Sequence, residues 1–526
     1  MSDETVATQS AAPPVVNPWI VAVAVMFSTF MEILDTTVVN VSLPLLAGDL
    51  SATVDESTWA LTSYLVANAI VLPMTGWLAS QFGRKRLLQL SVLGFTISSF
   101  LCGLSPTLGV LVFFRIIQGL SGGGLQPLSQ AVLLETFPPK DRGKAMGFWG
   151  LGIVTAPILG PVLGGWLTDS YSWRWVFYIN IPVGIASLVM THLFVHDPAY
   201  LKKKAARIDY WGIGLLALGI GALQIFLDKG QEDDWFSSNF IVILAVLAVG
   251  GLLIFTIREL TTDDPIVDLR ALRDRTYSAG VFLMTVLGFG LYGSLVLLPI
   301  LLQTLLGYPA LQAGFALSPR GVGSAIAMPF VGAISGKVST RLLLAIGFLG
   351  AAGTLLWFGA LDLNTGYWDL FWPQFLQGVC LGFLFVPLTT LTMAPIASEK
   401  MGNATSIFNL MRNIGGSVGI AYVTTMVARK EQVLTNLMGT HVSIYDARTR
   451  ALLDGLRNTF MSRGADATTA GQRAEMALFG MVQRQAAMLS FVQVFRFLGI
   501  VFIAMVPLIF LMRNPRPGAR PVEGIH

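Results

Sequence analysis

Residues 19–43 read WIVAVAVMFSTFMEILDTTVVNVSL, an apolar stretch that contains two acidic residues, Glu32 and Asp35. An α-helix needs about 20 apolar residues to cross the roughly 30 Å hydrocarbon core of a bilayer, so this stretch predicts a transmembrane helix. A charged side chain at mid-bilayer costs roughly 2.5–3.5 kcal/mol on insertion scales and usually marks an ion or proton pathway. Asp35, with Glu32 one turn before it, is therefore the first candidate for a functional residue.

The composition of the whole chain indicates a polytopic membrane protein. Of 526 residues, 54% are hydrophobic and only 12% are charged, and the mean hydropathy is +0.67. Soluble domains contain about 25% charged residues. We expect an all-α fold with fourteen transmembrane helices, at Trp19–Leu43, Thr58–Ser80, Leu87–Ser105, Leu108–Glu135, Ala145–Thr168, Trp175–Val195, Tyr210–Leu227, Asn239–Ile257, Tyr277–Leu302, Ala310–Ile334, Leu342–Leu361, Trp368–Met393, Asn403–Ala428 and Ala487–Met512.

The distribution of lysine and arginine predicts the orientation, because positive charges in short loops stay in the cytoplasm. The loops on one side carry twenty such residues, at positions 84–86, 140, 142, 144, 202–204, 207, 258, 270, 273, 275, 337, 341, 400, 513, 516 and 520. The opposite short loops carry only Arg174 and Lys229. Both termini are therefore expected in the cytoplasm. No small-residue cleavage site follows the first apolar stretch, so we expect it to remain in the mature protein.

An internal repeat divides the chain. FRIIQG at 114–119 resembles QFLQG at 374–378 at an offset of 259, and a second similarity links 76–88 to 332–343 at an offset of 256. Two parallel six-helix halves place a substrate site at mid-membrane between them. We expect a cytoplasmic tail at 1–18, an N-terminal half at 19–195, a linker with two inserted helices at 196–276, a C-terminal half at 277–512 and a cytoplasmic tail at 513–526.

A long segment before the last span, residues 429–486, is expected outside the cell. Its stretches Ala451–Met461 and Ala474–Val482 have helical apolar spacing, which predicts a helical hairpin. The alternative is a solvated loop with no partner.

Glu32 and Asp35 are three residues apart, so both lie on one helix face. A pair of buried carboxyl groups can bind and release a proton near neutral pH. For each acid an alternative stays open: Asp35 is locked to a basic partner or capped by polar neighbours, and Glu32 lines the pathway as an attractor of cations.

Arg115 is the natural partner of Asp35, because both residues fall at compatible depths from the outer ends of their spans. Arg115, Gln118, Gly119, Gly122 and Gln126 form one polar stripe at helical period, which predicts a polar face. A purely structural contact of the arginine with backbone carbonyls is the alternative.

Span five combines small residues and prolines, which predicts a closely packed, kinked helix. These residues are Gly152, Thr155, Pro157, Gly160, Pro161, Gly164 and Gly165. Plain packing without function is the alternative for the glycines. The loop with Gly83, Arg84 and Lys85 can equally be a topology determinant.

The second half offers polar and aromatic groups rather than acids. Asn409, Arg412 and Asn413 share a stripe of span thirteen, and Gln374 and Gln377 share one of span twelve. Tyr292 occupies the repeat position of Asp35. Arg320 and Arg496 also lie within spans, and Arg496 is close enough to the outer end to snorkel.

Three of these segments resemble motifs of the major facilitator superfamily, specifically its fourteen-helix drug:proton antiporters of the EmrB type. LDTTVVNV at 34–41, which includes Thr36 and Asn40, resembles the first-helix signature. RIIQG at 115–119 resembles the helix-four motif, whose arginine is implicated in proton transfer. Gly160-Pro161 with Gly164-Gly165 is similar to the helix-five motif of antiporters.

A fourth segment resembles the family only in part. Gly76-Trp77-Leu78-Ala79 through Gly83-Arg84-Lys85 is similar to the loop motif after helix two. Ser80 stands where the family has an acid, which weakens the case for a charge latch in this loop.

The resemblance implies a major facilitator fold and proton-driven efflux of amphipathic drugs and toxicants across a bacterial inner membrane. It also implies a tripartite pump with an EmrA-type membrane-fusion adaptor and a TolC-type outer-membrane channel. We expect alternating access, with Asp35, Glu32 and Arg115 coupling to protons. The candidate cavity residues are Thr36, Asn40, Gln118, Gln126, Tyr292, Gln374, Gln377, Asn409, Arg412 and Asn413.

Other classes are disfavoured. No Gly-x4-Gly-Lys-Ser/Thr phosphate loop occurs, which argues against nucleotide-driven transport. Cys102 and Cys380 fall within apolar spans, and the four histidines form no catalytic constellation, so we expect no enzyme, metal or cofactor other than H+ and no nucleic-acid partner. The remaining rivals are a proton-coupled or uniport importer and a non-transporting receptor or assembly platform.

Overall fold

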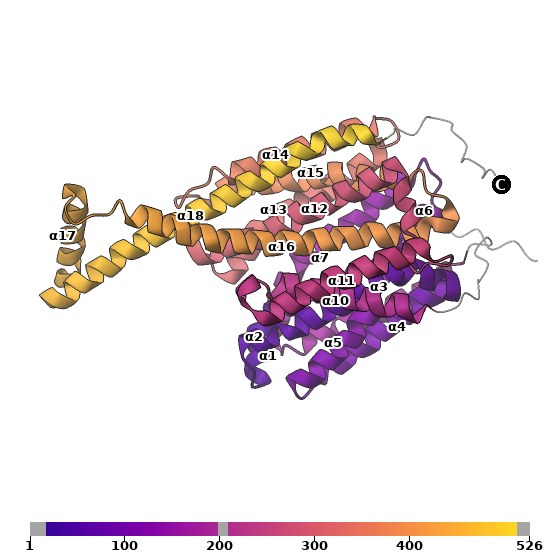
Figure 1. Ribbon diagram of the computed structural model, residues 1–526, viewed down its shortest axis with the longest axis horizontal. Coiled ribbons are helices and arrows are strands. Elements are labelled where there is room, and N and C mark those ends of the chain that lie inside the picture. The colour runs from indigo at the N-terminus through magenta and orange to yellow at the C-terminus, as the bar shows by residue number, and fades with distance from the viewer. Residues whose placement is uncertain (1–16, 198–208, 513–526) are drawn as a thin grey trace, which may run out of the picture.

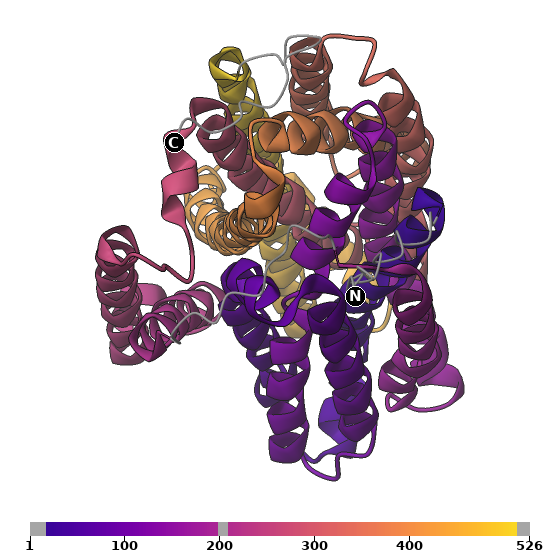
Figure 2. The same cartoon turned by 90° about the vertical axis from the view of Figure 1, so that its right-hand side faces the viewer.

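The computed structural model describes residues 17–197 and 209–512, and all regular elements in these two ranges are helices. Residues 1–16 of the predicted N-terminal tail, the predicted C-terminal tail, part of the predicted linker, and the basic residues at 202–204, 207, 513, 516 and 520 lie outside the described residues, whereas the last residue of the predicted N-terminal tail, Pro18, begins helix α1. The helices form two bundles that lie side by side (Figure 1). Figure 2 shows the bundles from one end, with a separate helical pair beside them.

The first bundle contains the helices that carry the acidic pair and its candidate partners. Its elements are α1 (Pro18–Asp49), α2 (Val54–Ser57), α3 (Trp59–Phe82), α4 (Arg84–Gly103), α5 (Leu108–Gly122), α6 (Leu125–Thr136), α7 (Arg142–Ser170), α8 (Trp175–Tyr178) and α9 (Asn180–Phe194). Helix α1 packs on α7 and α9, and α5 packs on α3 and α4.

The second bundle repeats this arrangement. Its elements are α12 (Arg275–Ile300), the π-helical turn η3 (Leu301–Leu305), α13 (Ala310–Ile334), α14 (Thr340–Phe358), α15 (Tyr367–Met393), η4 (Ser398–Lys400), α16 (Met401–Gly439), α17 (Ala447–Ser462), α18 (Ala467–Met505) and η5 (Val506–Leu511). Helix α12 packs on α16, and α13 packs on α15.

The helical pair beside the bundles, which lies between them in the sequence, consists of α10 (Tyr210–Lys229) and α11 (Asn239–Thr261), with the short turns η1 (Trp235–Ser237) and η2 (Leu269–Arg273). Helix α10 contacts both α3 of the first bundle and α16 of the second. Gln224 accepts a hydrogen bond of 3.1 Å from Ser417, and Trp235 donates one of 3.1 Å to Thr425. The pair therefore bridges the two bundles.

The all-α membrane class is confirmed, but the count of fourteen spans is not. Eleven helical segments of the described residues, with α5 and α6 counted together as one, are long and apolar enough to cross a membrane, or twelve when the bent helix α7 counts as one span. Helices α13 and α16 are not among them. Polar residues explain this physically, since α13 carries Arg320 and two internal prolines, and α16 carries Arg412 among several amides and glycines.

One predicted span is interrupted by a turn, and another is bent. Span four breaks into α5 and α6 at Gly123 and Gly124, where consecutive glycines give the backbone little helical preference. Helix α7 bends by 40° between Arg142–Pro157 and Leu159–Ser170. Proline removes a helical hydrogen bond and clashes with the preceding turn, so Pro157 and Pro161 account for the bend.

The bundles contact each other at the end that carries the basic loops. A Cβ atom on Gly147 would lie 2.6 Å from the backbone oxygen of Met328, and the rings of Trp149 and Phe385 lie 5.8 Å apart. Farther along α7, Gly160 and Gly164 pack against α1 of their own bundle. Near its N-terminal end α7 thus contacts the second bundle through Gly147 and Trp149, and farther along it contacts α1 through Gly160 and Gly164.

Residues 429–486, which we call the hairpin arm, continue from α16 through α17 into α18. Figure 1 shows α17 well away from both bundles. The predicted helical stretches fall within α17 and α18, and α18 runs on without interruption into the last span.

Candidate functional site

Asp35 lies at the centre of a buried cluster formed by α1, α5 and α9. Its Oδ2 atom is 2.5 Å from Nη1 of Arg115, and both side chains are inaccessible to solvent. Its Oδ1 atom accepts hydrogen bonds from Gln118 Nε2 at 3.0 Å and Asn180 Nδ2 at 2.7 Å. The acid is thus paired with a base, which is one of the two arrangements that the sequence left open.

Arg115 is held from several directions. Its Nε donates to the carbonyl of Ala60 at 2.8 Å, and Nη1 donates to Gln118 Oε1 at 2.8 Å. Its guanidinium carbon lies 4.2 Å from the ring centroid of Tyr64, within the range of a cation–π interaction. The arginine therefore connects α5 to α3 as well as to α1, and any change of charge on Asp35 acts on all three helices.

Glu32 has a different environment from Asp35, one turn away on α1. Its Oε1 atom accepts a hydrogen bond of 2.9 Å from Asn68 Nδ2, whereas Oε2 has no hydrogen-bond partner among the described residues. The residue is only 4% exposed. A buried polar atom without a partner carries a desolvation penalty of roughly 1–3 kcal/mol, so Glu32 is the less stabilised of the two acids.

Polar contacts join the two bundles at Gln126 and Gln130 of α6. Arg412 donates a hydrogen bond to Gln126 Oε1, and Asn409 donates one of 2.5 Å to Gln130 Oε1. All four side chains are buried. Three of them, Gln126, Asn409 and Arg412, were expected to line a substrate cavity, and here they form part of the contact between the bundles.

The helix-five motif presses α7 against α1. A Cβ atom on Gly160 would lie 2.1 Å from Oγ1 of Thr37, and one on Gly164 would lie 2.9 Å from the carbonyl oxygen of Val38. A Cβ atom on Gly152 would likewise lie very close to the side chain of Met26, whereas one on Gly165 would have no atom within 4 Å. The motif therefore sets the distance between α7 and the helix that carries Asp35.

The loop after α3 still forms an ion pair, although Ser80 replaces the acid that the family has in this motif. Arg84 forms a buried ion pair with Glu135 of α6, and its Nη2 lies 3.4 Å from the carbonyl oxygen of Ser398 in the second bundle. Gly83 has a φ of +84°, and the backbone amide of Lys85 donates to Asp197 at 2.8 Å. Glu135 thus supplies an acid near this loop.

A close approach of the bundles also involves Gly76. A Cβ atom there would lie 2.6 Å from the backbone of Asn403 in α16. Only glycine permits this approach without a shift of the backbone.

The remaining candidate residues have separate contacts in the structure. Gln377 accepts a hydrogen bond from Arg320, and Gln374 is fully buried. Tyr292 packs against Gly416, Thr36 donates to the carbonyl of Glu32, Asn413 is half-buried and Asn40 is exposed. In residues 17–197 and 209–512, no group of three histidine, cysteine or acidic side chains has the geometry of a metal site.

The polar residues of these clusters that were not selected from the sequence include Asn68, Gln130, Glu135, Asn180 and Asp197. Asn68 and Asn180 are polar residues within predicted apolar spans, which is the same signal that identified Asp35. Asp197 follows a predicted span end and carried no comparable signal.

Comparisons with known proteins agree with this architecture. Residues 25–420 match the model of the Major Facilitator Superfamily. The chain belongs to this superfamily. Over 437 residues it is 41% identical to the multidrug export protein EmrB of Haemophilus influenzae, covering 81% of this chain and 84% of that protein. It is 38% identical to the fatty acid resistance protein FarB of Neisseria gonorrhoeae, covering 94% and 96% of the two chains.

Solved structures support the same superfamily fold at low sequence identity. A double-tryptophan variant of XylE is 14% identical, with a TM-score of 0.62 over 95% of this chain and 96% of that one. The human organic anion transporter MFSD10 (TETRAN) is 13% identical, with a TM-score of 0.59 over 93% and 100%. The expected major facilitator fold is thereby confirmed, and the protein is a multi-pass membrane protein of a transporter family.

Proposed function

We propose that this protein exports amphipathic drugs and other toxicants across a bacterial inner membrane in exchange for protons. The names of its relatives support export, since they include a multidrug export protein and a fatty acid resistance protein. The excess of basic residues on one set of loops supports cytoplasmic termini. No catalytic reaction is assigned to the chain.

The observation that carries the proton coupling is the contrast between the two acids of α1. Asp35 is bonded to Arg115, Gln118 and Asn180, whereas one oxygen of Glu32 is unpaired. A proton on Asp35 would leave Arg115 as a buried charge without its counter-ion. Removing one partner of a buried ion pair costs roughly 3–5 kcal/mol, so protonation and the packing of α1, α3 and α5 are energetically coupled.

Alternating access gives this coupling a direction. The bundles contact each other at the end with the basic loops, and we propose that the opposite, external end opens to admit protons. A proton entering from outside first reaches the carboxyl pair of α1 and weakens the Asp35–Arg115 tie. The halves then rock, the proton leaves to the cytoplasm, and substrate moves outward in the return step.

Transport by everted membrane vesicles tests this proposal. Asp35→Asn is expected to abolish accumulation of a fluorescent amphipathic drug driven by an imposed pH gradient, and Glu32→Gln is expected to reduce it. Asp49→Asn is the matched control, because Asp49 lies on the same helix but is exposed at its end. Full transport by Asp35→Asn at normal protein levels would contradict the assignment, and drug movement in the opposite direction would favour an importer.

We further propose that the hairpin arm binds a membrane-fusion adaptor that leads to an outer-membrane channel. Val433 and Leu437 are one turn apart on α16, and Met476 and Phe479 are three residues apart on α18; all four are exposed apolar side chains. Exposed apolar residues on one face of a helix are typical of a protein interaction site.

Serine at Val433, Leu437, Met476 and Phe479 tests the adaptor proposal. We expect drug resistance of intact cells to fall sharply while transport by everted vesicles is retained, because only the external contact is changed. Serine at the exposed polar positions Gln432 and Gln472 is the control. Unchanged cellular resistance would count against adaptor binding.

A further inference from the structure

Arg320 on α13 is a buried cation without a counter-ion. The residue is 5% exposed, and no described carboxylate lies within ion-pair distance of it. Its Nη2 donates to Ser294 Oγ at 3.2 Å and to Gln377 Oε1, whereas Nε has no hydrogen-bond partner. A charge buried within a membrane helix is costly unless it is paired or functional.

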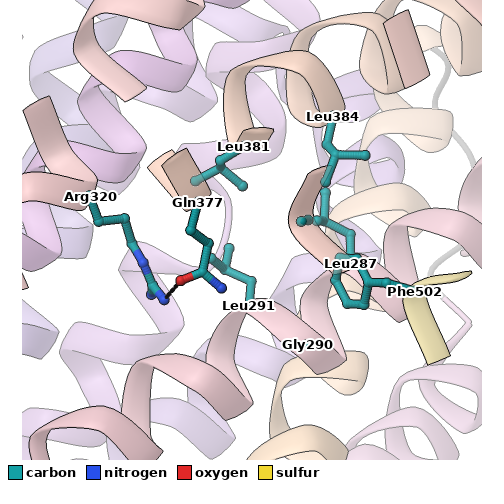
Figure 3. A pocket seen from close by; sticks show the side chains of 9 residues that line it. Leu287, Gly290, Leu291, Arg320, Gln377, Leu381, Leu384 and Phe502 are labelled. Atoms are coloured by element: carbon teal, nitrogen blue, oxygen red, sulfur yellow. Dashed lines mark hydrogen bonds between the residues drawn. The ribbon is translucent and has the colours of Figure 1, made fainter. Parts of the chain in front are cut away.

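The guanidinium group borders a narrow cavity inside the second bundle. Figure 3 shows Arg320 and Gln377 pointing toward each other, with apolar side chains beyond them. The apolar lining comes from α12, α14, α15 and α18 and consists of Leu287, Leu291, Ala351, Leu381, Leu384 and Phe502. About 20 Å³ of this space is accessible to water, which is enough for a water molecule.

A second unsatisfied polar group lies one helical turn from Gln377. Both Oε1 and Nε2 of Gln374 lack hydrogen-bond partners, and the residue is fully buried. Close backbone contacts hold this part of α15 against α13, because Cβ atoms on Gly323 and Gly378 would lie 2.1 and 1.9 Å from the carbonyl oxygens of Phe375 and Arg320. The unsatisfied donors are thus concentrated where these two helices meet.

We propose that this cavity binds the carboxylate group of an anionic amphipathic substrate, a role that rests on the export function proposed above. A carboxylate can accept two parallel hydrogen bonds from a guanidinium group, and such charge-assisted bonds are about twice as strong as neutral ones. The leucine side chains and Phe502 then contact the apolar chain of the ligand. The cavity admits only water in the present conformation, so binding requires these apolar side chains to move apart.

Equilibrium binding to the purified protein in detergent tests this site, with decanoate as the probe and decanol as the uncharged ligand of equal chain length. Arg320→Gln is expected to weaken decanoate binding roughly 10–100-fold, the loss of one charge-assisted contact, while decanol affinity changes less than about twofold. Gln377→Glu places a carboxylate beside Arg320 and is expected to block decanoate in the same selective way. Arg496→Gln is the control, because Arg496 is also a cation within a helix, α18, but donates its hydrogen bond to the carbonyl of Gly359.

The proposal is overturned if the wild type binds decanoate no better than decanol, or if both Arg320→Gln and Gln377→Glu leave decanoate affinity unchanged. An equal loss of both ligands in the two variants also overturns it, since that result indicates general damage. Binding is measured without a pH gradient, so the outcome does not depend on whether protons drive export. Failure of the vesicle experiment with Asp35→Asn would instead concern the coupling proposal alone.

Discussion

The two halves of the molecule share a fold but place their buried charges differently. In the first half, Arg115 on α5 stacks on Tyr64 of α3 and pairs with Asp35 of α1. In the second half, the offset of 259 places Gln374 at the position of Arg115, and the offset of 256 places Arg320 at the position of Tyr64. The buried arginine therefore lies on α5 in the first half but on α13 in the second half. The position of Asp35 holds no acid in the second half.

This difference suggests separate roles for the two halves, proton coupling in the first and binding of an anionic ligand in the second. Gln118 and Gln377, which are equivalent in the repeat, each contact the arginine of their own half. In the first half the arginine already has an internal counter-ion, so the local charge changes only by protonation. In the second half Arg320 lacks one among the described residues, so a ligand can supply it. Three predictions concern these two halves, and a fourth concerns the helical pair outside them.

The largest effect is expected from removing the cation of the first half. Arg115→Met leaves Asp35 buried without a counter-ion and is expected to destabilise the protein by roughly 3–5 kcal/mol. The double variant Asp35→Asn with Arg115→Met should recover much of this loss, because no charge is left behind. Thermal unfolding in detergent measures both. A double variant as unstable as Arg115→Met would contradict the view that the unpaired charge of Asp35 causes most of the loss of stability.

The second prediction concerns a feature that the halves share. Gly164 of α7 and Gly419 of α16 each meet a backbone carbonyl of the first helix of their half, and their Cβ atoms would lie 2.9 and 2.2 Å from Val38 and Phe289 oxygens. Alanine at either glycine is expected to cost roughly 1–3 kcal/mol through overpacking. Thermal unfolding is the measurement. Gly165→Ala, with no atom within 4 Å, is expected to be neutral, and an equal loss there would contradict the packing explanation.

The third prediction removes the cation of the second half. Arg320→Met is expected to change stability by no more than about 1 kcal/mol, because the gain from removing an unpaired buried charge offsets the hydrogen bonds to Ser294 and Gln377. The same unfolding measurement, run beside Arg115→Met, gives the comparison directly. A loss as large as that of Arg115→Met would show that Arg320 has a structural counter-ion after all.

The smallest effect belongs to the helical pair outside both halves. Asp209 caps α10, and a hydrogen bond from Arg258 lowers the pKa of Asp209 below its ordinary value. A lowered pKa contributes stability above the unfolded-state value of about 3.9, and this contribution is lost as the pH falls through the lower folded-state value. Asp209→Asn should therefore lose less stability than the wild type on acidification, by under about 1 kcal/mol. Identical acid unfolding of the two proteins would contradict this.

Much of the fold could be predicted from the sequence because bilayer thickness fixes the length of the membrane-spanning helices. The Asp35–Arg115–Gln118 contact could also be predicted, since each residue is polar within an apolar helix. Asn180 completes the cluster, and the same signal was present in its span. Its role depends on how α9 is rotated, which apolar composition alone does not determine.

Other features could not be predicted from local patterns. The break between α5 and α6 depends on two glycines that the apolar window spans without interruption. The pairing of Arg84 with Glu135 depends on how α4 and α6 meet, and the sequence reasoning considered only the acid missing at Ser80. The lack of a counter-ion at Arg320 could not be predicted from its own helix. It depends on which side chains all the neighbouring helices place around the guanidinium group.

Helix α18 has a mechanical consequence. It runs unbroken for 39 residues, about 58 Å at 1.5 Å per residue, from the hairpin arm into the second bundle. A tilt of about 10° at its membrane end would swing the distal end through about 10 Å. A partner bound at the distal end would therefore be displaced whenever α18 tilts within the second bundle.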